Sequence, residues 1–171
     1  MQYNVAQLLK EPIGSTRFYP VRADITDLDP ALPIVQLLVG EVRFLRTRSG
    51  ILAEGNLFTE VELACSRCQE PTVVRLDLEI EEEYHPTIDI LTGRRLVMEE
   101  EDRALWIDAH HILDLTEVVR QGLLLLLPMR PLCRPDCKGL CPVCGQNWND
   151  GPCDCAERES DSRWSALKEL L

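Results

Sequence analysis

Hydrophobic and polar residues alternate with a period of two along much of the first half of the chain. The clearest run spans Thr72 to Tyr84, where apolar residues from Val74 to Ile80 alternate with charged residues from Arg75 to Glu81. A period of two places successive side chains on opposite faces of a β-strand. We therefore predict a sheet with one packed face and one face in contact with solvent, as is common in antiparallel sheets.

Two further alternating runs precede this strand. Ile34–Arg46 and Ile51–Ala64 flank Thr47-Arg48-Ser49-Gly50, and a glycine-containing turn between two such segments indicates a hairpin. A shorter strand is expected over Arg17–Ile25. The second run leads directly into Cys65-Ser66-Arg67-Cys68, which the pattern places at the tip between two antiparallel strands.

Three helices are predicted from apolar spacing and from the residues at their ends. A short helix is expected over Val5–Lys10 and a final one over Ser162–Leu170. The sequence Asp114-Leu115-Thr116-Glu117 resembles a capping box and starts a helix that runs to about Leu127, where Pro128 ends it. The expected buried face of this helix consists of Leu115, Val118, Val119, Gly122, Leu123 and Leu126.

These elements predict an α+β fold. An antiparallel β-sheet or partly open barrel packs against a helix and is followed by a zinc-bound, cysteine-rich C-terminal lobe. We expect two domains, a β-rich core over 1–128 and a lobe with the terminal helix over 129–171. Within the core, Asp89–Asp102 is polar and is expected to form a surface excursion, after which Ala104–Ile107 returns to the sheet.

The eight cysteines give the clearest indication of a chemical role in the sequence. Cys65 and Cys68 form an isolated pair, and the other six follow as Cys133-x3-Cys137-x3-Cys141-x2-Cys144-x8-Cys153-x-Cys155. Structural zinc binds four cysteine sulfurs at the corners of a tetrahedron. A Cys-x2-Cys pair followed by glycine, as at Gly145, is typical of the tight turn in a zinc knuckle. Eight thiols therefore predict two structural zinc sites.

A disulfide framework is the alternative use of eight cysteines, and it requires an oxidising compartment. The residues Met1–Val5 include no charged region typical of a signal peptide. The most apolar run, Leu123–Leu127, is far too short to span a bilayer. We therefore expect a soluble, cytoplasmic protein without a membrane partner, in which the clustered thiols bind metal.

The charge of the chain disfavours a general nucleic-acid binder. The formal net charge is −11 and the isoelectric point is near 4.7, so the surface repels phosphates at long range. Acidic residues are concentrated in Glu79–Glu83 and Glu99–Asp102. By contrast, Arg130, Arg134 and Lys138 form a modest basic surface around the cysteines, and they are candidates for a weak contact with RNA or a partner protein.

Three segments of the C-terminal part carry a further signal: Leu132 to Gly145, Asn149 to Cys155, and Asp161 to Leu167. Together they resemble the C-terminus of the YceD family (domain of unknown function 177), with Cys65-Ser66-Arg67-Cys68 as a second hallmark. The resemblance implies a role in the accumulation of large-subunit (23S) ribosomal RNA, and hence in ribosome biogenesis. The expected partners are therefore large-subunit ribosomal RNA, ribosomal proteins or both, and the acidic runs favour basic ribosomal proteins by charge complementarity.

The division of the cysteines between two sites is predicted from the entropy of loop closure. Local closure favours one site made of two close pairs around an eight-residue loop: Cys141, Cys144, Cys153 and Cys155. The second site then combines the upstream pair with the first two cysteines of the lobe: Cys65, Cys68, Cys133 and Cys137. The alternative is one site formed by the four consecutive cysteines from Cys133 to Cys144, with the other four weakly bound or free.

A zinc ion held by four cysteines has no free position for water or substrate, so we expect a non-enzymatic protein that acts by binding. The chain has no Gly-rich phosphate loop or nucleophile elbow, and no small-molecule substrate is expected. The alternative function is a zinc-dependent thiol redox sensor or chaperone. A thioredoxin-like dithiol at Cys65 and Cys68 is disfavoured because such motifs open a helix, whereas the flanks here are strand-like.

Overall fold

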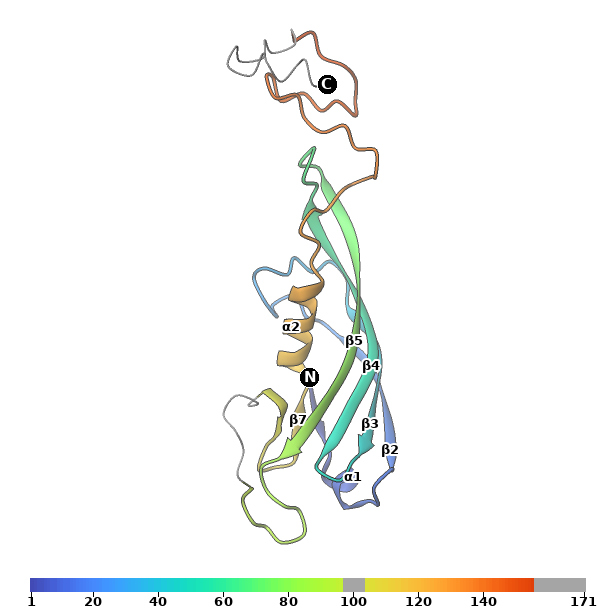
Figure 1. Cartoon of the computed structure of the whole chain (residues 1–171), viewed down its shortest axis with the longest axis vertical. Coiled ribbons are helices and arrows are strands. Elements are labelled where there is room, and N and C mark those ends of the chain that lie inside the picture. The colour runs from blue at the N-terminus through green and yellow to red at the C-terminus, as the bar shows by residue number, and fades with distance from the viewer. Residues whose placement is uncertain (97–103, 156–171) are drawn as a thin grey trace, which may run out of the picture. The chain divides into compact units, whose positions relative to one another are not determined.

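The main sheet has five strands in the order β2-β3-β4-β5-β6 (Figure 1). The computed structural model describes residues 1–96 and 104–155. The five strands are β2 (Thr16–Ala23), β3 (Leu38–Arg46), β4 (Ile51–Ala64), β5 (Pro71–Pro86) and β6 (Trp106–Ile107). The pairs β2–β3 and β3–β4 are antiparallel, whereas β6 runs parallel to β5, with His85 opposite Trp106. The expected all-antiparallel sheet is therefore wrong, and the sheet is mixed.

The hairpin of β3 and β4 follows the predicted pattern. The backbone N–H of Thr47 donates to the carbonyl of Gly50 at 3.1 Å, which closes the turn where the sequence places it. β4 has the predicted bounds, but β3 begins only at Leu38. Ile34, the expected start of that strand, forms a single isolated bridge to Val61.

β5 confirms the two-faced strand predicted from its alternation. The inward side chains Leu76, Leu78 and Ile80 are buried, and the residues between them are exposed. On the outer face, the guanidinium of Arg75 lies 4.2 Å from the ring centroid of Phe58 on β4. The inward residues join one hydrophobic core with the buried side chains of β3 and β4.

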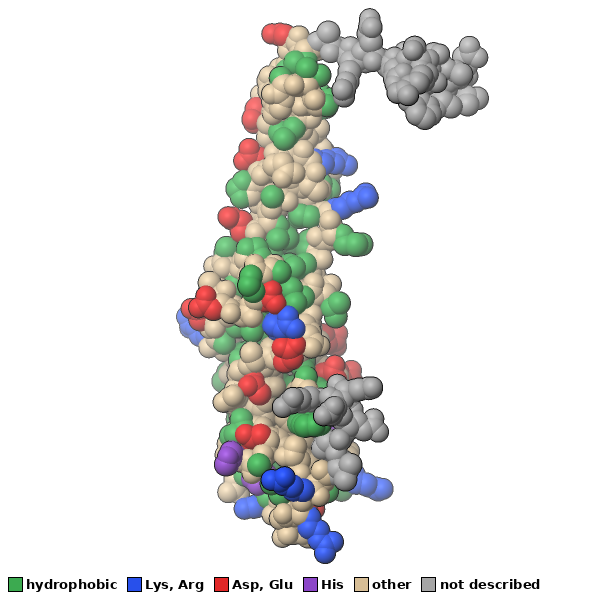
Figure 2. Space-filling view, turned by 90° about the vertical axis from the view of Figure 1, so that its left-hand side faces the viewer, with side chains coloured by type: hydrophobic (Ala, Val, Ile, Leu, Met, Phe, Trp, Pro, Cys, Tyr) green, Lys and Arg blue, Asp and Glu red, His purple; other side chains and the backbone are tan. Residues whose placement is uncertain are grey.

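Helix α2 (Thr116–Leu126) packs closely against β5, because Gly122 has no side chain. A Cβ atom at that position would lie 2.5 Å from Cδ1 of Leu78. Val119 and Leu123 are fully buried, as predicted, but Leu126 is 40% exposed and was wrongly assigned to the buried face. Figure 2 views the molecule from the side of α2 and shows exposed hydrophobic side chains interspersed with carboxylates.

A second, two-stranded sheet pairs β1 (Gln2–Asn4) with β7 (Ile112–Asp114), just before α2. Between β1 and β2 lies the short helix α1 (Ala6–Lys10), close to its expected bounds. The expected capping box at the start of α2 is wrong, because Leu115 is the N-cap residue and makes no side-chain cap. Instead, Oδ1 of Asp114 accepts a 2.8 Å hydrogen bond from the backbone N–H of Thr116.

The chain forms two compact units. The first comprises 1–63 and 73–129, and the second comprises 64–72 and 130–171. The second unit includes the tip of the β4–β5 hairpin, and in its described part the only β-pairing beyond that hairpin is an isolated bridge between Leu140 and Asn147. The helix expected over Ser162–Leu170 and the end of the excursion, 97–102, lie outside the described residues. No helix within the described ranges is long and apolar enough to cross a membrane.

Candidate metal centres

The second unit gathers all eight cysteines into two groups of four. The hairpin group consists of Cys65, Cys68, Cys133 and Cys137, and the loop group consists of Cys141, Cys144, Cys153 and Cys155. Within each group the sulfur atoms lie within 4.8 Å of one another. This is the grouping that loop closure favours, and the alternative set of four consecutive cysteines is not brought together. The role of these cysteines as metal ligands stays a prediction.

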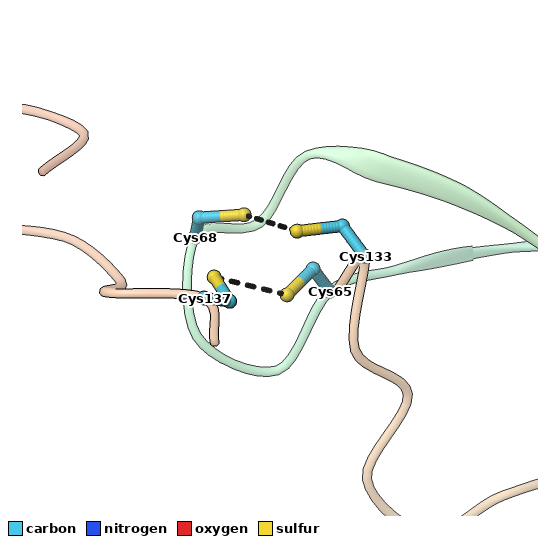
Figure 3. Close-up of side chains that lie close together, drawn as sticks. All are labelled: Cys65, Cys68, Cys133 and Cys137. Atoms are coloured by element: carbon cyan, nitrogen blue, oxygen red, sulfur yellow. Dashed lines mark hydrogen bonds between the residues drawn. The ribbon is translucent and has the colours of Figure 1, made fainter. Parts of the chain in front are cut away.

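The hairpin group has the dimensions of a tetrahedral metal site. The Sγ atoms of Cys65 and Cys137 are 3.8 Å apart, and those of Cys68 and Cys133 are 3.6 Å apart (Figure 3). Four sulfurs at 2.3 Å from a central zinc ion would be separated by about 3.8 Å. Both of these separations match the value expected around a zinc ion.

A tight turn at the hairpin tip presents the first two sulfurs. The backbone N–H of Cys65 donates to the carbonyl of Glu70 at 2.8 Å, and the N–H of Gln69 donates back to the carbonyl of Cys65 at 2.9 Å. Gln69 has a φ of 61°, in the left-handed region that non-glycine residues rarely adopt. Cys65 and Cys68 are both buried.

Three hydrogen bonds join the hairpin tip to the segment that supplies the other two sulfurs. Ser66 N–H donates to the carbonyl of Pro131 at 2.8 Å, and Leu140 N–H donates to the carbonyl of Arg67 at 3.2 Å. The guanidinium Nη1 of Arg67 donates to the carbonyl of Cys137 at 2.7 Å. Arg67 therefore positions Cys137, a role that the sequence analysis missed because nothing in the spacing distinguishes it.

The loop group starts with the same kind of turn. Cys141 N–H donates to the carbonyl of Gln146 at 2.8 Å, and Gly145 N–H donates to the carbonyl of Cys141 at 2.9 Å. Gly145 has a φ of 75°, so a glycine stands where the left-handed conformation requires it. This confirms the turn predicted from Cys144-Gly145. The loop group is more exposed than the hairpin group, because Cys144 is exposed and Cys153 is half-buried.

Backbone N–H groups stabilise one thiolate in each group. The N–H groups of Cys68 and Cys133 lower the pKa of Cys65 to about 6, and those of Cys144 and Val143 lower the pKa of Cys141 to about 6. One thiol in each group shifts the other way: desolvation and the neighbouring thiols raise the pKa of Cys133 to about 12, and the neighbouring thiols and desolvation raise the pKa of Cys155 to about 12. Four sulfurs this close cannot all carry negative charge unless a cation compensates it, and a divalent metal does so.

Two neighbouring side chains each donate a hydrogen bond to a sulfur of a different group. Nδ2 of Asn149 donates to Sγ of Cys137 at 3.3 Å and lowers the pKa of that thiol. Nε1 of Trp148 donates to Sγ of Cys153 at 3.4 Å. Hydrogen bonds of this kind orient metal ligands and tune their charge. Trp148 and Asn149 therefore link the two groups, and spacing alone could not identify this.

The three basic residues singled out in the sequence are all exposed in the second unit: Arg130, Arg134 and Lys138. Among the described residues, Arg134 pairs with Asp136 alone, with 3.9 Å between its Nε and Oδ1 of Asp136, and such exposed pairs contribute little. The backbone N–H of Lys138 donates to Oδ1 of Asn149 at 2.9 Å, and the side chain of Lys138 forms no ion pair with the residues that the structure describes. Their role as contact residues stays a prediction.

Comparison with known proteins identifies the family. Residues 53–171 match the family model described as large ribosomal RNA subunit accumulation protein YceD. An uncharacterized protein of Mycobacterium tuberculosis is 32% identical over 136 residues, which cover 79% of this chain and 62% of the relative. The chloroplastic YCED homolog 1 of Arabidopsis thaliana is 27% identical over 171 residues, covering 88% of this chain and 52% of the relative.

The chain thus spans only part of these curated relatives, between about half and three fifths of their length. No solved structure matches it. The family match covers both four-cysteine groups and the helix α2. The protein belongs to the YceD family.

Proposed function

We propose that this protein is a cytoplasmic, non-enzymatic zinc-binding factor that supports accumulation of large-subunit (23S) ribosomal RNA during ribosome biogenesis. The observation that carries the proposal is a pair of four-cysteine groups, each with its sulfurs within 4.8 Å of one another, in a member of a family described by ribosomal RNA accumulation. The Arabidopsis relative bears the same description. In this proposal the two zinc ions are structural, and ribosomal RNA or basic ribosomal proteins are bound by the surrounding surface.

The donor set supports binding rather than catalysis. Four cysteine sulfurs complete the coordination of a zinc ion, so water and substrate find no open position on it. All-sulfur tetrahedral sites also favour zinc or iron–sulfur centres over metals that prefer oxygen. A site of this kind stabilises a small unit that has little hydrophobic core of its own, and buried cysteines form the centre of the second unit.

An acidic sheet face supports basic proteins as partners. The outward residues of β4 and β5 include Glu60, Glu62, Asp77, Glu79 and Glu81, with Arg75 as the only cation on these two strands' outer face. Charge complementarity of this kind favours encounter with positively charged proteins and selects against acidic ones. Free RNA would be repelled by the same face.

The second unit supplies a surface of different character. Arg67 and Lys138 line a cleft of about 860 Å³ together with Trp148, whose side chain is 36% exposed. Asp136 and Asp150 also line this cleft. Cations beside an aromatic face are the combination with which proteins hold single-stranded RNA. With Arg134 close in sequence, this surface would make the local contact to ribosomal RNA.

The test is co-sedimentation with large-subunit particles. In Arg134→Glu/Lys138→Glu, association with the particles is expected to be lost while the zinc content per chain stays unchanged. A matched control, Arg22→Glu/Arg48→Glu, makes the same charge change at exposed positions of the first unit. Unchanged sedimentation of the first variant, or equal loss in the control, contradicts the proposal.

A thiol redox sensor is the second candidate, favoured by the paired sulfurs of the hairpin group at 3.6 and 3.8 Å. In this alternative, peroxide takes two electrons from two cysteine thiolates, a disulfide forms, water is released and the zinc ion leaves. Mild peroxide would release one zinc per chain, and a thiol reductant would restore its binding. Retention of both zinc ions under these conditions excludes the sensor.

A further inference from the structure

A groove lies beside β5 and α2, entirely within the first unit. Its volume is about 400 Å³. It is lined by residues 78–82 of β5, by Val118, Gln121, Gly122 and Leu125 of α2, and by Ala104 and Leu105. None of these positions belongs to the cysteine groups or to the basic surface of the second unit. Glu79 and Glu81 also belong to the acidic face of the sheet, but the proposed function does not explain the apolar part of the groove.

The floor and one wall of the groove are apolar. Leu78 and Ile80 are almost fully buried at the floor. The absence of a side chain at Gly122 lets the helix approach the strand closely, and Leu125 projects from the same helix with 86% of its surface exposed. A large hydrophobic side chain this exposed next to an apolar hollow is typical of a contact surface.

The rim of the groove carries charge of one sign only. Glu79, Glu81 and Glu82 line it and are exposed, and no lysine or arginine is among the lining residues. Within the described part of the chain, none of these three carboxylates forms an ion pair. A bound partner would therefore meet three uncompensated negative charges, which favours cations and repels phosphates.

Part of the edge of β5 beside the groove is unpaired among the residues that the structure describes. β4 occupies one side of β5, and on the other side β6 pairs only with His85 and Pro86. Among the described residues, no strand pairs with 78–82 on that side. An unpaired edge presents backbone N–H and C=O groups to which another extended segment can add.

We propose that this groove binds an extended segment of a partner protein in which lysine or arginine alternates with apolar residues. The segment adds to this part of the β5 edge, its apolar side chains contact Leu78 and Leu125, and its cations meet the rim carboxylates. Strand addition of this kind obtains affinity from main-chain hydrogen bonds and specificity from alternate side chains. Insofar as a basic ribosomal protein supplies the segment, the inference rests on the proposed function.

The test is fluorescence anisotropy with a labelled peptide of alternating lysine and valine. Replacing three exposed carboxylates in Glu79→Gln/Glu81→Gln/Glu82→Gln is expected to weaken binding about tenfold, since each exposed ion pair contributes modestly. Asp24→Asn/Asp27→Asn/Glu41→Gln removes the same charge at exposed positions of the first unit outside the groove and is expected to change affinity less than about twofold, since salt screens distant charges. Equal weakening by both variants overturns the groove as the site.

Three further measurements test the geometry. Leu125→Ser is expected to weaken peptide binding without lowering thermal stability, because the side chain is exposed. Bound peptide should slow amide exchange at 78–82, and protection found only elsewhere contradicts strand addition. A peptide with glutamate in place of lysine should not bind. An RNA oligonucleotide that displaces the basic peptide also overturns the proposal.

The outcome is independent of the test of the proposed function. The peptide assay uses purified full-length protein without ribosomal particles, whereas the sedimentation test uses Arg134→Glu/Lys138→Glu, which leaves the groove intact. Failure of the peptide to bind therefore contradicts the groove as a binding site and does not affect the proposed function. Unchanged sedimentation of Arg134→Glu/Lys138→Glu contradicts the proposed function and leaves the groove proposal unaffected.

Discussion

The two four-cysteine groups start with the same turn, but they obtain their remaining two cysteines in different ways. In each, the N–H of the first cysteine donates to a carbonyl five residues later, at Glu70 or Gln146, and the residue after the second cysteine donates back. The hairpin group then recruits Cys133, 65 residues beyond Cys68, whereas the loop group is completed locally. The turn is thus a property of local sequence, and the hairpin group also depends on the tertiary fold.

The groups also differ in burial. Three of the four sulfur-bearing residues of the hairpin group are buried, and they form the small core of the second unit. In the loop group only Cys141 is buried. Metal in the hairpin group should therefore contribute to the folding of the unit, while metal in the loop group should mainly order its own loop.

The largest expected effect follows from removing the hairpin pair. Cys65→Ser/Cys68→Ser should lower zinc from two ions to one per chain by native mass spectrometry. It should also abolish amide protection at Ser66 and Leu140, because structural zinc supplies on the order of 10 kcal/mol of folding free energy. Cys153→Ser/Cys155→Ser should likewise lose one ion but keep that protection. Two ions in either variant would show that the changed pair is not a ligand set.

Metal removal by a chelator should distinguish the groups in the wild-type protein. The loop group has an exposed cysteine and two half-buried ones, so a competing ligand reaches its metal more easily. We expect two phases of zinc release, with the faster phase absent in Cys153→Ser/Cys155→Ser. A single phase of release would contradict a difference between the groups. A fast phase that disappears in Cys65→Ser/Cys68→Ser would show that the hairpin group releases its metal first.

Exchanging the residues after the second cysteine should produce a smaller, reciprocal effect. Gly145→Gln places a side chain in the left-handed conformation and should destabilise the loop group by about 1 kcal/mol. A Cβ at this position meets no atom within 4 Å, so backbone strain alone is responsible. Gln69→Gly should relieve the same strain at the hairpin tip. Zinc affinities from chelator competition provide the measurement, and a loss of affinity in both variants contradicts the shared turn.

The smallest effect concerns the first unit and serves as a reference for the others. Arg120 donates hydrogen bonds to Glu117 and Asp29 and holds the pKa of Glu117 down to about 2. This stabilisation is present above the ordinary pKa of 4.5 and is lost as the pH falls through about 2. Arg120→Gln should therefore speed amide exchange at Val119 modestly at pH 7, with the difference vanishing near pH 2. Zinc content at pH 7 should not change.

Much of the sheet could be predicted because its signals are local and repeated. The turn 47–50 and the long alternation of β4 and β5 each specify their own strand. By contrast, β6 and β1 have two and three residues, too few to show a period, and only tertiary pairing stabilises them. The parallel β5–β6 pair and the small β1–β7 sheet could not be found in this way.

For the candidate site, the grouping of the cysteines could be predicted, but the side chains that support them could not. Spacing and closure entropy were enough to group the eight sulfurs, since the loop group closes on itself and leaves the remaining four together. Neither argument identifies Arg67 or Asn149. Each acts through a hydrogen bond to Cys137, which is distant in sequence. Such contacts are specified by the folded geometry rather than by a motif.

The long sequence separation within the hairpin group also has a consequence for synthesis of the chain. At 5–20 residues per second, about 3 to 13 s pass between translation of Cys68 and translation of Cys133, given their separation of 65 residues. During that interval Cys65 and Cys68 have been translated, whereas the other two cysteines of the hairpin group have not. The loop group is completed soon afterwards, so the nascent chain acquires the ligands for both ions almost together.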